Sequence, residues 1–425
     1  MKKIISLACI LFSFHFSFSQ KTLIHCGNLI DCTGNEVKKE MTVIVEGKKI
    51  VSVEKGYKTP AGTDKVIDLK NKTVLPGLMD MHVHMEFEAR KGGAIDEFTM
   101  NPADYAFNSV GYANTTLMAG FTTVRDLGGS GVNISLRNAI NAGKITGPRI
   151  FTAGKAISGT GGHMDPTNGY CDALMGDPGS KEGVANGVDE CKKAVRQQYK
   201  NGADLIKIAS TGGVLSMAKD GSAPQYSEEE ITAIVQTAKD LGLNVACHAH
   251  GAEGMKRAVR AGVISIEHGT LMDDEVMSLM KQHGTYYVPT IIAGKSVADS
   301  AKIPGFYADI VVPKALSIGP KIQATFGRAY KTGVKIAFGT DAGVYKHGRN
   351  ALEFQYMVEA GMPAIEAIRS ATVSSSVLLG ISDILGTIQA GKIADIIAVD
   401  EDPLVNIKTL MNVKFVMKEG IIYKQ

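Results

Sequence analysis

The middle of the chain alternates short apolar runs with helical stretches. Eight runs have the length and composition of buried strands: residues 79–84, 121–126, 149–153, 204–209, 244–250, 265–268, 285–290 and 334–340. Helical stretches such as 182–200 and 227–241 lie between them, and Ser227 with Glu230 forms a capping box at the start of the second. Eight strand–helix units within residues 76–382 predict an α/β fold built on a (β/α)8 TIM barrel.

A doubly wound open sheet is the alternative arrangement for such a pattern. It predicts a Gly-x-Gly-x-x-Gly motif after an early strand, and the sequence has none there. Glycines at 159–162 and 212–213 do follow strands, but they lack the Lys-Ser/Thr or the spacing of a phosphate-binding loop. The barrel is therefore the favoured interpretation.

Both ends of the chain have a different texture from the middle. Residues 20–75 and 383–425 consist of short β-type runs separated by turns, with no long helical period. The runs are residues 22–24, 41–45, 50–53, 66–69, 387–388, 393–399, 413–417 and 421–423. We expect the two ends to form one small composite β-sandwich domain beside the barrel of residues 76–382.

The first 19 residues have the features of a secretory signal peptide. Met-Lys-Lys precedes an apolar run at 4–18, which is too short to span a membrane as a helix. We expect cleavage near Ser19 or Gln20 and a periplasmic or secreted protein, in preference to lipid anchoring at Cys9. Removing Lys2 and Lys3 leaves 46 − 2 = 44 basic residues against 43 acidic ones. This balance predicts no nucleic-acid partner and no anionic membrane surface as a partner.

Five cysteines follow the signal peptide, namely Cys26, Cys32, Cys171, Cys191 and Cys247. An odd number in an exported protein leaves at least one thiol unpaired. Cys247 lies within an apolar strand, which favours a buried free thiol there. Disulfides between Cys171 and Cys191 or between Cys26 and Cys32 remain open.

Unusual polar residues stand at the predicted carboxyl ends of five strands, the face where barrel enzymes place their active sites. They are His82 and His84, Lys207, His248 and His250, Glu267 and His268, and Asp341. Side chains two apart on a strand share a face, so paired histidines can approach one metal ion together. A lysine within an apolar run must be neutralised or used, and a neutral amine can add carbon dioxide to form a carbamate that bridges two metals.

These residues resemble the amidohydrolase superfamily, and more narrowly its imidazolonepropionase-like and Xaa-Pro-dipeptidase-like branch. The motifs that carry the resemblance are Pro-Gly-Leu-Met-Asp-Met-His-Val-His at 76–84, Gly-Phe-Thr-Thr-Val-Arg-Asp-Leu-Gly at 120–128, Ser-Gly-Thr-Gly-Gly-His at 158–163, His-Ala-His at 248–250, Ile-Glu-His-Gly at 266–269, Thr-Asp-Ala-Gly at 340–343 and Gly-Thr-Ile-Gln-Ala-Gly-Lys-Ile-Ala-Asp at 386–395. The resemblance covers nearly the whole chain after the signal peptide, and no ligand position of the pattern is substituted.

The resemblance implies a binuclear centre of two divalent ions, with zinc expected from the imidazole and oxygen ligands. Its ligands would be His82, His84 and Asp341 at one ion, His248 and His268 at the other, and Lys207 as a bridging N6-carboxylysine. We expect a metal-bridged hydroxide to attack an amide carbonyl that His250 helps to polarise. Asp341 would carry the proton to the leaving nitrogen.

Several further residues are weaker candidates. His163, after a glycine-rich loop, and His347, six residues beyond Asp341, are candidates for contact with a substrate carboxylate, and Arg349 is a weaker one. Arg125 and Asp126 are adjacent at a strand end, and we expect them to form a structural ion pair.

The predicted activity is hydrolysis of the amide bond of dipeptides or N-acyl amino acids by a metal-dependent hydrolase. A cyclic-amide or lactone hydrolase and a non-catalytic barrel protein are the alternatives. We expect residues 293–312 to form a loop and helix over the mouth of the barrel, in the position of a lid. We also expect a homo-oligomer.

Overall fold

The computed structural model describes residues 20–425, so the predicted signal peptide lies outside the described residues. Seven of the eight predicted barrel strands form, all in parallel pairs. One sheet contains β5 (Leu78–Val83), β6 (Phe121–Asp126) and β7 (Arg149–Thr152). The other contains β8 (Ile206–Ala209), β9 (Val245–Ala249), β10 (Ser265–His268) and β11 (Tyr286–Val288).

Single parallel bridges join the two sheets. Ile157 pairs with Ile208 on one side, while the segment at 334–342 lies between β11 and β5 through bridges from Ile336 to Tyr287 and from Ala342 to Val83. This segment is the eighth predicted strand, and it does not form a regular ladder. One physical reason is that the Thr340 N–H is shared between the Asp80 carboxylate, at 3.1 Å, and the His82 carbonyl, at 3.4 Å. The fold is therefore TIM barrel-like, with a mostly parallel sheet.

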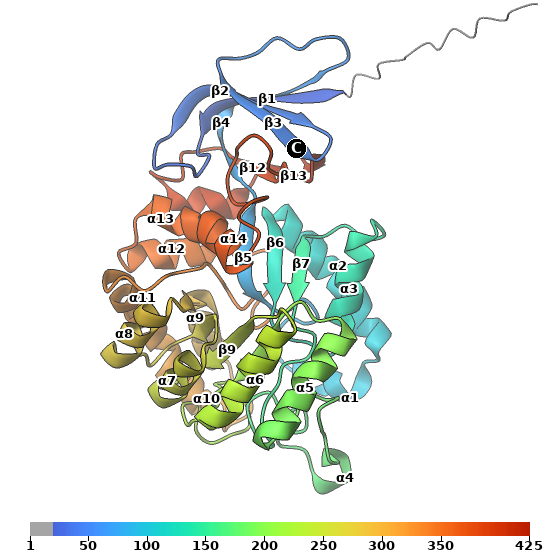
Figure 1. The fold of residues 1–425 in the computed structure, drawn as a ribbon, viewed down its shortest axis with the longest axis vertical. Coiled ribbons are helices and arrows are strands. Elements are labelled where there is room, and N and C mark those ends of the chain that lie inside the picture. The colour runs from blue at the N-terminus through green and yellow to red at the C-terminus, as the bar shows by residue number, and fades with distance from the viewer. Residues whose placement is uncertain (1–19) are drawn as a thin grey trace, which may run out of the picture.

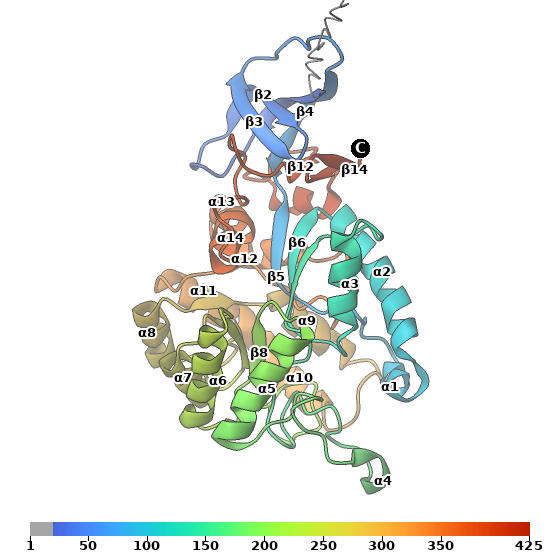
Figure 2. The same cartoon turned by 45° about the vertical axis from the view of Figure 1, so that its right-hand side comes forward.

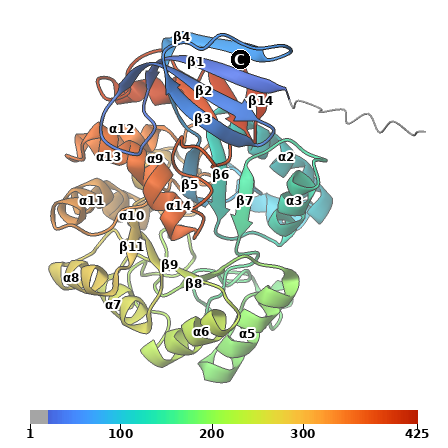
Figure 3. The ribbon, with the colours of Figure 1, turned by 45° about the horizontal axis from the view of Figure 1, so that its top comes forward.

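Helices cover the outside of these strands, as Figure 3 shows. The longer ones are α2 (Pro102–Met118), α3 (Val132–Asn141), α5 (Gly187–Asn201), α6 (Glu228–Asp240), α7 (Ala252–Ala261), α8 (Asp274–His283), α9 (Ile291–Ser300), α11 (Ile322–Lys331) and α12 (Leu352–Glu359). Shorter helical turns are η1 (Gly93–Ile95), α1 (Asp96–Thr99), α4 (Asp172–Met175), α10 (Val312–Ile318), η2 (Gly319–Lys321), α13 (Ala364–Arg369), η3 (Ser370–Ser374), α14 (Ser375–Leu378) and η4 (Ile407–Asn412). The predicted capping box is confirmed, because Ser227 and Glu230 each bind the other's backbone N–H.

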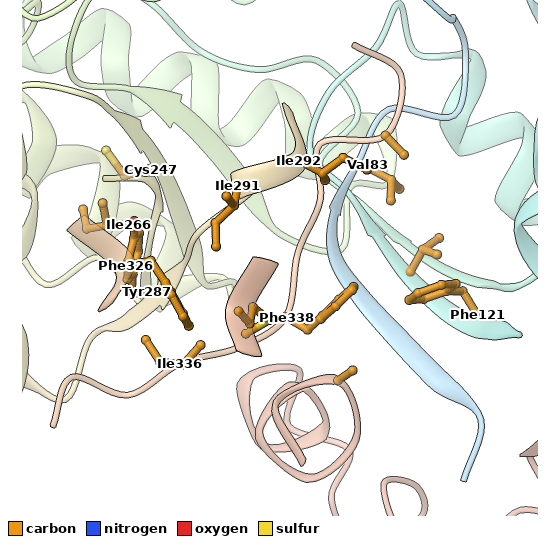
Figure 4. Packing of buried hydrophobic residues seen from close by; sticks show 14 of the residues in the cluster. Val83, Phe121, Cys247, Ile266, Tyr287, Ile291, Ile292, Phe326, Ile336 and Phe338 are labelled. Atoms are coloured by element: carbon orange, nitrogen blue, oxygen red, sulfur yellow. The ribbon is translucent and has the colours of Figure 1, made fainter. Parts of the chain in front are cut away.

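The apolar core lies between the parallel strands and the helices. Figure 4 shows side chains from both sheets and from the helices around them meeting there, among them Val83, Phe121, Cys247, Ile266, Tyr287, Phe326 and Phe338. All of these are buried. Burial of each such side chain stabilises the fold by roughly 1.5–3 kcal/mol before the entropy of ordering the chain is counted.

The two chain ends pair in one seven-stranded mixed sheet, in the order β14-β13-β12-β4-β1-β2-β3. Its strands are β1 (Lys21–Leu29), β2 (Lys38–Glu46), β3 (Lys49–Lys55), β4 (Lys65–Pro76), β12 (Ile396–Val399), β13 (Phe415–Lys418) and β14 (Ile421–Lys424). The predicted strand at 387–388 does not form. The N–H of Ile388 instead binds the Asp31 carbonyl, at 3.0 Å.

This terminal sheet lies at the amino-terminal side of the barrel-like strands, at one end of the molecule in Figures 1 and 2. The Lys418 ammonium donates to the Gly147 carbonyl, just before β7, and Gly77 N–H donates to the Asp395 carbonyl. Arg149 in β7 pairs with Asp395 and Glu419 at 2.9 and 2.8 Å. The terminal sheet therefore supports the face opposite to the carboxyl ends of the strands.

All five cysteines of the described residues are free thiols, so neither candidate disulfide is present. Cys247 is buried, as predicted. Among residues 20–425, every helix is too short or too polar to cross a bilayer.

Candidate metal centre

Four of the predicted histidines and Asp341 meet at the carboxyl ends of the barrel-like strands. The His82 ring centroid lies 5.4 Å from that of His84 and 4.9 Å from that of His268, and the His248 and His268 centroids are 4.7 Å apart. Nitrogens of His82 and His268 and a carboxylate oxygen of Asp341 all lie within 4.8 Å of one another. The strand ends thus bring together side chains that are up to 259 positions apart in the sequence, 341 − 82.

The backbone at these strand ends is held in an unusual conformation. His268, Thr290 and Asp341 have φ values of +69°, +54° and +60°, the left-handed region that non-glycine residues rarely occupy. Such residues cost free energy and persist only where the surrounding structure holds them. Here the conformation turns His268 and Asp341 toward the same space.

Each of three histidines is oriented by a hydrogen bond at Nδ1. The partners are Glu267 Oε2 for His82 at 3.0 Å, the Gly128 carbonyl for His84 at 2.6 Å and Thr290 Oγ1 for His268 at 2.7 Å. A partner at Nδ1 leaves Nε2 free to bind a metal, and such contacts are the usual way in which proteins orient imidazole ligands.

His248 is oriented the other way round. Its Nε2 lies 3.1 Å from the Gly212 carbonyl, whereas its buried Nδ1 has no hydrogen-bond partner. The free nitrogen of His248 is therefore Nδ1. Residue type and spacing do not indicate this difference, because the nitrogen is chosen by a carbonyl on a neighbouring loop.

Lys207 is fully buried in β8, and its Nζ has no hydrogen-bond partner among the described residues. Burial lowers the pKa of Lys207 to about 8, although the nearby carboxylates of Glu267 and Asp341 raise it. A buried amine without a partner costs folding free energy. Its persistence at the centre of a polar cluster fits a group that is completed by something outside the chain.

Asp341 supplies the carboxylate of the cluster. Its Oδ1 lies 3.5 Å from Nε2 of His82 and 3.3 Å from Nε2 of His84, but neither contact has hydrogen-bond geometry. Two ligands of one tetrahedral ion with bonds of about 2.1 Å are about 3.4 Å apart. The spacing, the free imidazole nitrogens and the orphaned Lys207 Nζ all fit a metal site.

Glu267 is a member of the site whose role was not predicted. Its carboxylate contacts His82, as described above, and also accepts from Arg125 Nη2 at 2.8 Å, with both side chains buried. Although burial raises the pKa of Glu267, the Arg125 guanidinium and His82 hold it at about 2. The predicted Arg125–Asp126 pair is wrong: adjacent strand residues point to opposite faces, and Asp126 instead accepts from Met85 N–H and Asn133.

Replacing Glu267 with glutamine should lower the free energy of unfolding of the chelator-treated protein by about 3–5 kcal/mol, because Arg125 is then left without a compensating charge. Urea unfolding measures the change. The exposed Glu229→Gln variant is the control and should stay within about 0.5 kcal/mol of the wild type. Equal stability of the two variants would show that the pair contributes nothing to the fold.

Asp80 links the strand of His82 to the segment of Asp341. Its Oδ2 accepts from Thr340 Oγ1 at 2.6 Å and from Asn350 Nδ2 at 2.8 Å, and burial raises its pKa to about 7. The sequence showed an aspartate two residues before His82, but its partners are 260 and 270 positions away.

Two of the predicted substrate-contact residues line the cavity beside the cluster. His250 binds Thr270 Oγ1 through Nδ1 at 3.0 Å, and burial lowers its pKa to about 4, so the ring is neutral at pH 7. The His163 ring centroid lies 4.2 Å from that of His248, and its Nδ1 is buried without a partner. Both side chains face the same space as the metal-ligand candidates.

The structure does not bring His347 to this cavity. Its Nε2 lies 3.3 Å from the Phe87 carbonyl and its ring stacks on Tyr112 at 4.8 Å. Arg349 is exposed and also lies outside the cavity lining. The predicted substrate contact by His347 is therefore not supported, because nearness to Asp341 in sequence does not determine where a loop side chain points.

The cavity over the cluster has a volume of about 1050 Å³, at the upper end of the range for small-molecule sites. One wall is polar and contains the histidines. Another part of the lining is mainly apolar and comes from α9, residues 306–322 and the loop after β8: Val214, Leu215, Met217, Ala293, Val297, Phe306, Tyr307, Val311, Ile318 and Ile322. Residues of the predicted lid region at 293–312 line the cavity, and the first part of that region is the helix α9 rather than a loop.

Comparisons with known proteins identify relatives over almost the full length. The model of the amidohydrolase family matches residues 73–422. The chain is 32% identical to ochratoxinase of Aspergillus niger over 95% of this chain and 86% of that protein.

Solved structures agree with this assignment. A Xaa-Pro dipeptidase with bound methionine in the active site is 54% identical, with a TM-score of 0.94 over 96% of this chain and all of that chain. A prolidase complexed with N-methylphosphonate-L-proline is 33% identical, with a TM-score of 0.87 over the same shares. The predicted resemblance is confirmed by these matches. With its strand-end donor set and these relatives, the chain belongs to the amidohydrolase family and is a hydrolase that acts on amide bonds.

Proposed function

We propose that this protein is a binuclear metal-dependent amidohydrolase that cleaves the amide bond of dipeptides or N-acyl amino acids. The observation that carries the proposal is the set of buried donor atoms that converge without partners: Lys207 Nζ, His248 Nδ1 and Asp341 Oδ1. Buried polar atoms in native folds almost always have a partner, so three such atoms in one cluster fit a site for metal ions.

His82, His84 and Asp341 would hold one divalent ion, His248 and His268 the other, with Lys207 as a bridging N6-carboxylysine. Zinc suits this donor set best. Bound there, the ions would lower the pKa of a water molecule and polarise the substrate carbonyl.

The remaining chemistry falls to side chains of the chain itself. His250, neutral and fixed by Thr270, is placed to donate a hydrogen bond from Nε2 to the carbonyl oxygen as negative charge develops. Asp341 accepts the proton of the attacking water and delivers it to the leaving nitrogen. His163, on the same wall, would contact the substrate carboxylate.

The substrate class is supported by the relatives and by the cavity. The similar proteins are a Xaa-Pro dipeptidase with bound methionine, a prolidase with a proline phosphonate and an ochratoxinase. The apolar wall offers room for a large hydrophobic group on one side of the scissile bond, while the histidines offer polar contacts on the other.

We also propose that the parallel strands and the segment at 334–342 form a closed (β/α)8 barrel over residues 76–382. The bridges at both sides of the two sheets support closure. We propose a composite β-sandwich for residues 20–75 and 383–425, since buried side chains of β1 and β2 share one apolar cluster with those of β12 and β13. An experimental structure would test both.

A substrate screen tests the proposed function. Purified protein should hydrolyse members of a dipeptide and N-acyl amino acid panel, lose turnover with a chelator and regain it with Zn²⁺, and bind two metal equivalents per chain. If the protein hydrolysed only cyclic amides or lactones, the proposed substrate class would be wrong. Full activity without divalent metal would overturn the proposed metal-dependent mechanism.

Export and assembly are further proposals. The apolar run at 4–18 after two lysines supports cleavage near residue 19 and a periplasmic or secreted location, which the intact mass of protein from a periplasmic extract would test. Exposed apolar side chains on α1, α2 and α4, including Phe98, Phe107 and Leu174, support a homo-oligomer. Light scattering after size-exclusion chromatography would measure the number of subunits.

A further inference from the structure

Lys314 on α10 is a buried cation that faces only backbone oxygens. It is 6% exposed, and its Nζ donates to the carbonyls of Gly213, Ser216 and Ala218 at 3.3, 2.5 and 2.6 Å. Among the described residues no carboxylate lies within 4 Å of it. All three acceptors belong to one loop, the segment that follows β8.

The helix that carries Lys314 is fixed from the other side. Residues Gly294 in α9 and Gly319 in η2 approach so closely that a Cβ at Gly319 would overlap the Gly294 carbonyl oxygen. Ala315 and Ile318 of α10 are buried as well. The Lys314 ammonium is therefore a fixed point against which the loop is held.

The loop has two contacts with the candidate metal centre. The Gly212 carbonyl accepts from His248 Nε2, as described above. Gly213 lies against the His163 ring so closely that a Cβ there would overlap it. The position of the loop backbone therefore affects the orientation of one predicted metal ligand and of one predicted substrate contact.

The same loop forms part of the apolar wall of the cavity. Val214, Leu215 and Met217 line the same cavity as the histidines, and Val214 and Leu215 pack against the cluster of Val297, Ala301 and Ala315. The six residues 213–218 begin with a glycine and form no regular secondary structure, so the loop has little stiffness of its own. The three charge-assisted hydrogen bonds from the Lys314 ammonium hold the loop backbone in place.

We propose that Lys314 is a positioning residue for substrate selection, which holds the loop at 213–218 as a rigid wall for the bulky apolar group of the substrate. This inference rests on the proposed amide hydrolysis for its substrate. The claim that Lys314 holds the loop does not rest on that function, because the contacts of Lys314 are independent of any ligand. All three acceptors of Lys314 lie in the loop that supplies Val214, Leu215, Ser216 and Met217 to the cavity lining.

The test compares Lys314→Met, which keeps the length and apolar stem, with Lys314→Arg, which keeps the charge. The matched control is Lys302→Met, an exposed lysine 12 positions earlier in the chain. Hydrogen exchange of the backbone amides at 212–220 reports the loop directly. Steady-state kinetics with N-acetyl-L-methionine and N-(2-naphthoyl)-L-methionine report selection by size.

We expect faster exchange at 212–220 in Lys314→Met alone, and a ratio of kcat/KM for naphthoyl over acetyl substrate that falls about tenfold, mainly through KM. Lys314→Arg should restore most of the ratio. Unchanged exchange would overturn the proposal, and so would an equal loss of kcat on both substrates with a lower melting temperature, since that result describes a structural lysine only. If wild-type protein cleaved no member of the dipeptide and N-acyl amino acid panel, the proposed function would fail, and exchange alone would decide the role of Lys314.

Discussion

Asp341→Asn should lower kcat on the substrate found by the screen about 10³-fold or more, within the range expected for loss of a positioned proton carrier at a metal. Asparagine has the same shape as aspartate, so the backbone at φ +60° and the contacts around it remain. What it lacks is the charge and the ability to accept the proton of the attacking water. The measurement is steady-state kinetics of metal-loaded protein, with metal content determined on the same sample.

The control for this variant is Asp189→Asn, because the Asp189 side chain is fully exposed on α5 and should tolerate the change without effect. Unchanged unfolding by urea would show that Asp341→Asn acts on chemistry and not on folding. Full activity of Asp341→Asn with two ions bound would rule out Asp341 as the proton carrier.

Lys207→Met should have opposite effects on the loaded and the metal-free protein. Without the bridging group, bound metal should fall below two equivalents, and the loss of several kcal/mol of charge stabilisation should lower activity about 10³-fold. In the presence of chelator the same change should raise the free energy of unfolding by on the order of 1–3 kcal/mol, because a buried amine without a partner is replaced by an apolar side chain.

The exposed Lys281→Met variant on α8 is the control, and both its metal content and its stability should match the wild type. A loss of activity in the loaded protein together with a gain of stability in the metal-free protein separates a functional lysine from a structural one. A chelated Lys207→Met protein that unfolds more easily than the wild type would mean that attraction to the Glu267 and Asp341 carboxylates outweighs the cost of burying the Lys207 amine.

The candidate ligands were predictable because local pattern and residue type place them at strand ends, and the resemblance to the amidohydrolase superfamily implies that they bind metal. His82 and His84 are two apart on a strand, and Lys207 interrupts an apolar run, so neither needed knowledge of distant residues. The shared face of the polar residues followed as well, since parallel barrel-like folds place the carboxyl ends of all strands on one face.

Other features depend on residues far away in the sequence. Glu267 was recognised only as the neighbour of His268, because its partner Arg125 is 142 positions away. The eighth strand was predicted from its apolar run, yet the Asp80 side chain, 260 positions earlier, takes one of its N–H groups. His347 was assigned to the site from its distance to Asp341 along the chain, and the packing of Tyr112 directs it elsewhere.

By itself, the sequence determined which residues could bind metal and on which face they would lie, because strand periodicity and residue chemistry are local properties. Only the tertiary structure decided which nitrogen each histidine offers, which carboxylate orients His82 and how Lys314 holds the cavity wall. Those outcomes depend on hydrogen-bond partners that chain folding brings from distant positions, and no local pattern encodes the direction in which a distant carbonyl or carboxylate will point.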